Sequence, residues 1–131
     1  MHPKLVEAKQ RQAGAGYERY IAWKLRSNGW DVVETGRDGV GDHGIDLIAT
    51  KDGKKRYVQC KGWKWWKTLH EDVVSQLFGS VAGIEGAENL SGNIEMYIYS
   101  PAKLSDYANS EADKLHVQFV RAGFPHWRRK H

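Results

Sequence analysis

Cysteine, proline and long apolar runs are all scarce in this chain of 131 residues. The single cysteine excludes an internal disulfide, and together with six scattered histidines it forms no recognisable zinc spacing. No apolar run approaches the roughly 20 residues that cross a bilayer, and the first residues lack the apolar segment of a signal peptide. We therefore expect a soluble, cytoplasmic protein with no membrane partner.

The composition is that of an ordinary globular domain, with 40% hydrophobic and 27% charged residues. The 20 Lys and Arg residues outnumber the 16 Asp and Glu residues, and the resulting formal charge of +4 favours a polyanionic partner. The length predicts one domain over 1–131, with 1–14 and 121–131 as flexible or peripheral ends. We therefore expect no separate recognition domain.

A β-hairpin between Gly44 and Gly62 is the most informative segment. Asp52-Gly53 separates two β-prone runs and is typical of a two-residue type I′ turn, which fixes the register of the two strands. Counting outward from Lys51 opposite Lys54 places Asp46 opposite Gln59.

Alternation along the two strands then sorts their side chains between two faces. One face carries a polar trio, Asp46, Gln59 and Lys61, beside the apolar pair Ile48 and Tyr57. The other face is apolar and is predicted to be core; it carries Ile45, Leu47, Val58 and Cys60. Cys60 has no activating histidine nearby, so we expect it to pack in the core. An acid, an amide and an amine that meet on one half-buried patch indicate a candidate chemical site.

A helix is predicted from about Gly16 to Asn28, with Ile21 and Leu25 on its apolar side and Gly29 at its C-terminal end. Glu18 borders that apolar side, so we expect it to point toward the sheet. A boundary glutamate can also remain in solvent or pair with a neighbouring cation.

Taken together, these residues resemble the PD-(D/E)XK nuclease superfamily, and within it the Mrr-like restriction endonuclease branch. The resemblance is carried by Glu18, by Asp42-His43-Gly44-Ile45-Asp46 and by Gln59-Cys60-Lys61, where Gln-x-Lys replaces the usual acid-x-Lys. It is close from about Gly16 to Trp63 and looser to about Val120. It implies that the catalytic residues are Glu18, Asp46, Gln59 and Lys61.

The chemistry of phosphodiester hydrolysis assigns roles to the same residues. Hard oxygen ligands suit Mg²⁺, for which Mn²⁺ can substitute. We expect Asp46 to be the principal ligand, assisted by the Gln59 carbonyl oxygen, the Cys60 backbone carbonyl, and Glu18 either directly or through water. Cationic Lys61 would orient water or stabilise developing charge. An amide in place of a carboxylate weakens such a site, and only the resemblance accounts for Gln59.

The glycine-rich segment Gly36–Gly44 formally matches a dinucleotide-binding motif at Gly39–Gly44. That motif requires a strand before it and a helix after it, whereas here a strand follows, so we reject it. Asp42 could assist the site from this loop, and His43 has no derivable role. Arg37 is a candidate contact to nucleic acid.

Cations alternate with three indoles in Lys61–Lys67, directly after the hairpin. Ammonium groups can contact phosphates while indoles stack on exposed bases. The alternative is that one or two of the tryptophans lie in the core or at a dimer interface. The predicted nucleic-acid contacts are Lys64, Trp65, Trp66 and Lys67, with Arg128 and Arg129 at the C-terminal end.

Five more elements complete the prediction. Their expected ranges are a strand at Trp30–Thr35, a helix at His70–Ala87, a strand at Ile94–Tyr99 and a helix from the cap Ser105 to about Leu115; a strand at His116–Val120 follows. The order α-β-β-β-α-β-α-β predicts an α/β domain with a mixed central sheet flanked by helices. This is also the element order of the restriction-endonuclease-like fold.

The resulting expectation is a metal-dependent DNA endonuclease that acts as a homodimer, with two sites for two strands. Small relatives in the superfamily include Holliday-junction resolvases, so a structure-selective resolvase is an alternative. A non-catalytic nucleic-acid-binding subunit with the same fold is another.

Overall fold

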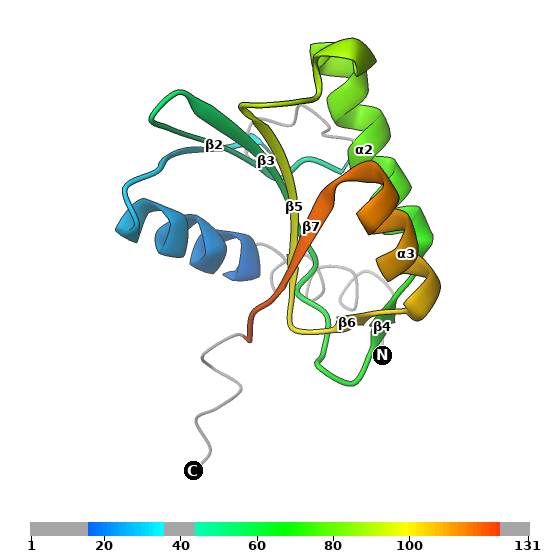
Figure 1. Cartoon of the computed structure of the whole chain (residues 1–131). Helices are drawn as coiled ribbons and strands as arrows, with labels where there is room; N and C mark the ends of the chain where they lie inside the picture. Colours follow the sequence, from blue (N-terminus) through cyan, green and yellow to red (C-terminus); the bar gives the residue numbers. More distant parts are fainter. Residues whose placement is uncertain (1–15, 36–43, 124–131) are drawn as a thin grey trace, which may run out of the picture.

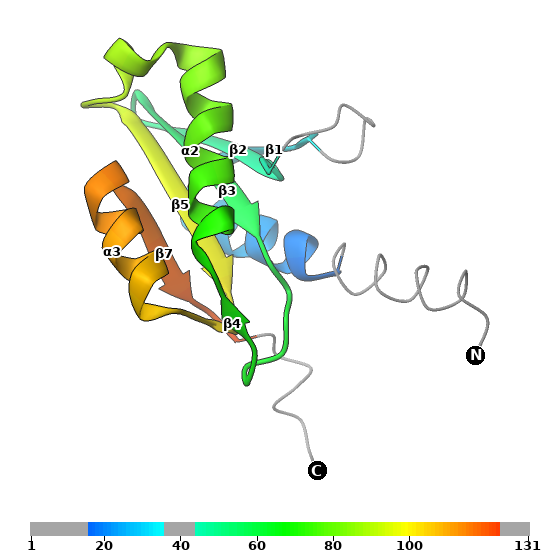
Figure 2. The same ribbon diagram turned by 90° about the vertical axis from the view of Figure 1, so that its right-hand side faces the viewer.

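The computed structural model describes residues 16–35 and 44–123. A five-stranded sheet with the order β1-β2-β3-β5-β7 forms its central layer. Figure 1 shows the N-terminal helix, which is helical over 16–27 among the described residues, on one face of this sheet, and α2 and α3 on the other. Figure 2 shows the same three layers from the side of α2 and α3. The predicted α/β class with a mixed central sheet is confirmed.

The element order also agrees with the prediction. The elements after the N-terminal helix are β1 Asp31–Glu34, β2 Leu47–Lys51, β3 Lys54–Cys60, β4 Thr68–Leu69, α2 Glu71–Glu85, the 3₁₀ turn η2 Ala87–Asn89, β5 Ile94–Ser100, β6 Lys103–Leu104, α3 Asp106–Leu115 and β7 Val117–Arg121. Only η2 and the two-residue strands β4 and β6, which pair in parallel, were not predicted. Strands this short carry no readable periodicity.

The register of the hairpin is confirmed from its turn to Leu47. Lys51 pairs with Lys54 and Leu47 with Val58, and both turn residues have positive φ, 51° at Asp52 and 81° at Gly53. These are the signs that a type I′ turn requires. β1 extends the antiparallel part, whereas β3, β5 and β7 are parallel.

Two separate cores lie on the two faces of the sheet. The core under α2 and α3 contains Tyr57, Ile98 and the buried positions Val73, Val74, Leu77 and Val81 of α2. Their spacing of three and four residues makes one apolar face of that helix. The core under the N-terminal helix contains Tyr17, Ile21, Leu47, Val58 and Cys60. Cys60 therefore packs in the core, as predicted.

The predicted pairing fails at Ile45 and Asp46. Ile45 was expected to share a face with Leu47, yet it lies in the core under α2 and α3 with Tyr57. The reason is that the regular ladder ends at Leu47 and Val58, and the Asp46 N–H donates to the Val58 carbonyl (2.8 Å). Asp46 and Gln59 are thus not a ladder pair, and alternation cannot be counted through the irregular segment.

The described structure continues to residue 123, into the segment 121–131 that was expected to be a flexible or peripheral end. Arg121 is the last residue of β7, and its side chain donates to two backbone carbonyls. Ala122 is buried, and its neighbourhood is fixed by a 2.7 Å hydrogen bond from the Tyr17 hydroxyl to the Ala122 carbonyl.

Candidate active site

Asp46 lies directly before Leu47, the first residue of β2. Its carboxylate serves as a hydrogen-bond acceptor in place of a backbone carbonyl. Its Oδ2 accepts a hydrogen bond from the Cys60 N–H (2.8 Å). The Lys61 N–H bonds the Tyr99 carbonyl of β5, so the Cys60 N–H faces the opposite edge of β3, toward β2. In an extended strand the carbonyl of a residue points to the same edge as its N–H. The Asp46 carboxylate and the Cys60 carbonyl therefore occupy one edge of β3, beyond the end of the ladder.

Gln59 is the buried polar group of this region. It is only 3% exposed, and its Oε1 has no hydrogen-bond partner among the described residues. An unsatisfied buried acceptor is destabilising by about 1–3 kcal/mol. Such a group persists in folded proteins where function, water or an ion accounts for it. The Gln59 carbonyl oxygen thus has the chemistry of a ligand.

Gly44 and Gln76 contribute to the surroundings of Gln59. The backbone of Gly44 has φ +92°, and a Cβ there would lie 3.1 Å from Gln76 Cγ and 3.4 Å from Gln59 Nε2. Gln76 of α2 was not among the predicted site residues, because in the sequence it is simply a polar position on the exposed side of a helix. Only the packing of α2 against Gly44 brings it near Gln59.

Lys61 follows directly after β3, and its backbone continues the ladder to β5. Because side chains alternate along an extended backbone, the Lys61 side chain lies on the same face as that of Gln59. Its ammonium lies 6.0 Å from the centre of the Trp63 ring. The residue is partly buried.

Three carboxylates lie within electrostatic reach of the Cys60 thiol. Burial raises the thiol pKa well above its usual range, and the charges of Asp46, Glu18 and Glu34 add to that effect. The charge of Glu18 on the N-terminal helix thus reaches Cys60 of β3. That Glu18 points toward the site stays a prediction. Glu34 was not predicted; it belongs to β1 and pairs with Arg26 at 3.3 Å. The sequence signal for Glu34 was its position two residues after Val32 on a short strand, which places both side chains on the same face.

The described part of the chain contains no group of three His, Cys, Asp or Glu side chains arranged to hold a metal ion. The oxygen donors here are one carboxylate, one orphaned amide oxygen and one backbone carbonyl. Mg²⁺ commonly uses one or two carboxylates and completes its shell with water and substrate phosphates. The donors of Asp46, Gln59 and Cys60 fit that requirement. Asp42, His43, Arg37, Arg128 and Arg129 lie outside the described residues.

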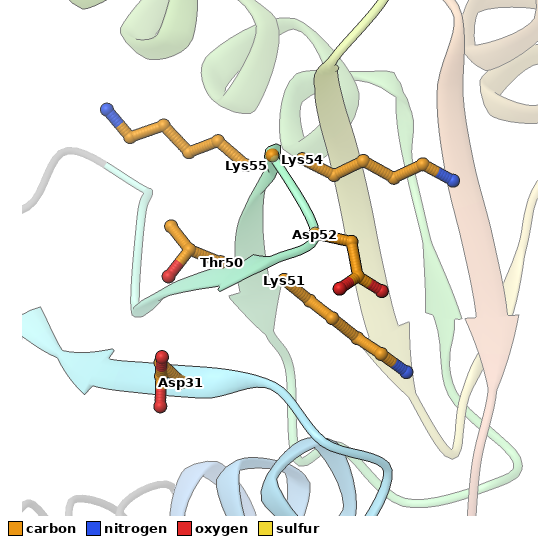
Figure 3. A pocket seen from close by; sticks show the side chains of 7 residues that line it. Asp31, Thr50, Lys51, Asp52, Lys54 and Lys55 are labelled. Atoms are coloured by element: carbon orange, nitrogen blue, oxygen red, sulfur yellow. The ribbon is translucent and has the colours of Figure 1, made fainter.

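A cavity of about 310 Å³ lies at the opposite end of the hairpin. Its lining includes Lys51, Lys54 and Lys55, and Figure 3 shows Lys51 and Lys55 pointing in opposite directions. The Lys51 ammonium donates to the Asn28 carbonyl (2.6 Å), and that of Lys55 contacts Glu85 (3.2 Å). Asp52 of this turn follows Asp46 by six residue steps along β2, or about 20 Å. The cavity therefore belongs to the hairpin turn and not to the candidate site.

The sequence matches the Mrr catalytic domain, described as a restriction endonuclease, over residues 10–122. The chain belongs to the Mrr-type restriction endonuclease family. The match spans the N-terminal helix, the hairpin and the parallel strands, so it includes Glu18, Asp46, Gln59 and Lys61. The comparison with curated proteins finds no match.

Solved structures agree on the fold. A protein of unknown function is similar with a TM-score of 0.62 and 18% identity, over 82% of this chain and 56% of that one. A repair endonuclease from Pyrococcus abyssi has a TM-score of 0.58 and 16% identity over 86% of this chain and 46% of that one. The complex of EndoMS with double-stranded DNA has a TM-score of 0.58 and 14% identity, over 82% and 45%.

The Mrr-type chain thus spans about half the length of the solved structures it resembles. At these identities the likeness establishes the restriction-endonuclease-like fold. Among the described residues, no helix has the length and apolar character needed to span a membrane.

Proposed function

We propose that this protein is a divalent-metal-dependent endonuclease that hydrolyses phosphodiester bonds of DNA. The observation that carries the proposal is the buried Gln59 Oε1, which has no hydrogen-bond partner among the described residues. Gln59 directly precedes Cys60, whose N–H fixes the Asp46 carboxylate. Membership of the Mrr-type family supports nuclease chemistry. The similar structures of a repair endonuclease and of a DNA complex support DNA as the substrate.

Asp46, Gln59 Oε1 and the Cys60 carbonyl would hold Mg²⁺ or Mn²⁺, with Glu18 contributing directly or through water. When bound, the cation supplies a Lewis acid for the scissile phosphate. The fixed hydrogen bond from the Cys60 N–H holds the Asp46 carboxylate in place before substrate arrives, which lowers the reorganisation needed for binding.

Lys61 supplies the positive charge of the site. On the face it shares with Gln59, its ammonium would orient the attacking water or stabilise charge that develops on the phosphoryl oxygens. The net charge of +4 favours encounter with a polyanion. A homodimer would place one such site on each DNA strand, and sedimentation of the purified protein with and without DNA would measure that assembly.

The test is cleavage of supercoiled plasmid, linear duplex and a four-way junction by the purified chain, with Mg²⁺, Mn²⁺ or EDTA. Lys61→Ala and Asp46→Asn are compared with wild type, and Lys54→Ala at the distant hairpin turn is the matched lysine control. We expect metal-dependent cleavage that both site variants lose and Lys54→Ala retains, with DNA binding preserved in all.

Folded wild-type protein that binds DNA but cuts none of the three substrates would instead identify a non-catalytic binding subunit. Cleavage restricted to the junction would identify a structure-selective resolvase. Cleavage that survives both site variants would exclude the proposed residues.

A further inference from the structure

The loop between β3 and β4 presents two tryptophans at the tip of a turn. The Lys67 N–H donates to the Lys64 carbonyl (2.9 Å), and this bond closes a four-residue turn with Trp65 and Trp66 at its two central positions. Trp65 is 61% and Trp66 59% exposed. The loop lies at the end of the sheet away from the β2–β3 turn (Figures 1 and 2). Neither indole is part of the core, so the alternative that Trp65 and Trp66 are core residues is excluded.

Turn centres are normally occupied by Gly, Asn, Asp, Pro or Ser, because these residues suit the backbone and tolerate water. Two exposed indoles there contribute nothing to turn formation and leave apolar area in solvent. Trp63, on the same loop, is 44% exposed. A local concentration of exposed aromatic surface of this kind marks a site of interaction.

The tryptophan turn is held rigidly on the rest of the fold. Arg121 of β7 donates from Nη2 to the Trp65 carbonyl (2.9 Å) and from Nε to the Pro101 carbonyl (2.9 Å). The Trp65 and Trp66 rings pack edge to face, with centroids 5.6 Å apart. Since β4 pairs with β6 directly after the turn, both ends of the loop are fixed. The indoles are therefore preorganised, which lowers the entropic cost of stacking on a ligand.

The charge around the indoles selects the class of partner. Residues 61–70 include three lysines and no acidic residue. The Lys64 ammonium lies 6.0 Å from the Trp66 ring centre, and that of Lys61 lies 6.0 Å from the Trp63 ring centre. Cations beside exposed aromatic faces are complementary to phosphates beside exposed bases. A purely apolar protein interface would not require this alternation.

We infer that Trp65 and Trp66 stack on unpaired bases and so direct the site toward DNA that is locally unpaired or distorted. The inference rests on the proposed function for DNA as the partner, and it adds the form of DNA that is preferred. Trp65 follows Lys61 by four positions, so their Cα atoms are at most about 14 Å apart, or about four base-pair steps of duplex. The turn can therefore contact bases close to the scissile phosphate.

The experiment measures binding in EDTA, so that cleavage does not enter. Fluorescence anisotropy is recorded with two labelled duplexes of equal length, one fully paired and one with a central bulge of unpaired nucleotides. Trp65→Ala and Trp66→Ala are compared with wild type and with Trp23→Ala, which removes an indole that is 62% exposed on the N-terminal helix. Sedimentation of each variant without DNA accompanies the titrations.

Wild type and Trp23→Ala should prefer the bulged duplex, and each turn variant should lose about tenfold in affinity for it with little change for the paired duplex. Trp65→Phe should retain most of the preference. Equal losses on both duplexes, or none, would overturn the inference while leaving the plasmid cleavage result intact. A shift from dimer to monomer in the turn variants would overturn it in favour of a protein interface. Absence of any DNA binding by wild type would remove the proposed function as well.

Discussion

The two ends of the β2–β3 hairpin use polar side chains in opposite ways. Near the turn, Lys55 and Tyr57 both donate to Glu85, and Lys51 donates to a backbone carbonyl. At the other end, Gln59 Oε1 is buried without a partner among the described residues, and indoles project into solvent from the loop that follows. Satisfied polar groups stabilise a fold, whereas unsatisfied ones remain available to a ligand. The difference supports the proposal that the functional end of the hairpin is the one that carries Gln59.

The largest effect is expected from Asp46→Asn. The amide carbonyl can still accept from the Cys60 N–H, so the unfolding free energy should change little. Loss of the carboxylate charge removes the proposed main metal ligand and should lower the cleavage rate about a thousandfold or more. Single-turnover cleavage and thermal unfolding measure the two quantities. Cleavage near the wild-type rate would place the functional site elsewhere.

The second-largest effect is expected at Gln59, where one substitution should lower cleavage and leave stability nearly unchanged. Gln59→Met keeps the side-chain volume and removes the unsatisfied buried acceptor, so the unfolding free energy should stay within about 1 kcal/mol of wild type. Cleavage at limiting metal should fall at least about tenfold. Gln59→Glu, which keeps an oxygen at the position, is the control. A variant that unfolds easily and still cuts would assign Gln59 a structural role.

At the turn end, Gly53→Ala should affect stability alone. A Cβ at Gly53 meets no atom within 4 Å, so the only penalty is the positive φ of 81°. The expected destabilisation is about 1–2 kcal/mol. Urea unfolding measures it, and the cleavage rate of the folded variant should equal that of wild type. Loss of activity in folded Gly53→Ala would show that the two ends are coupled.

The smallest effect concerns the pH dependence of Glu85. Hydrogen bonds from Tyr57 and then Lys55 lower the pKa of this carboxyl from its usual value of about 4.5. The folded state therefore binds the proton less tightly than the unfolded state, and the stabilisation is complete above pH 4.5 and disappears as the pH falls through the lowered pKa. Unfolding of wild type and Glu85→Gln across this range should show a difference that vanishes in acid. A difference independent of pH would assign the effect to packing.

Much of the fold followed from local patterns in the sequence. The Asp52-Gly53 turn set the hairpin register as far as Leu47, because a type I′ turn admits one pairing. The apolar spacing predicted the helix α2, and Ser105 capped α3 by accepting from the Ala108 N–H, as expected. These features depend on residues a few positions apart. The Mrr-like resemblance likewise rested on short motifs.

The tertiary structure decided what these patterns could not. The displacement of Ile45 and the hydrogen bond from Cys60 to Asp46 arise where the ladder stops, and no periodicity describes an irregular segment. The exposure of Trp65 and Trp66, and the burial of Gln59, depend on Arg121 and α2, which are distant in sequence. The sequence by itself determined the elements and the identity of the candidate residues, because local steric and hydrogen-bonding preferences act over a few positions. Which side chains are buried, satisfied or exposed was decided by packing between distant segments.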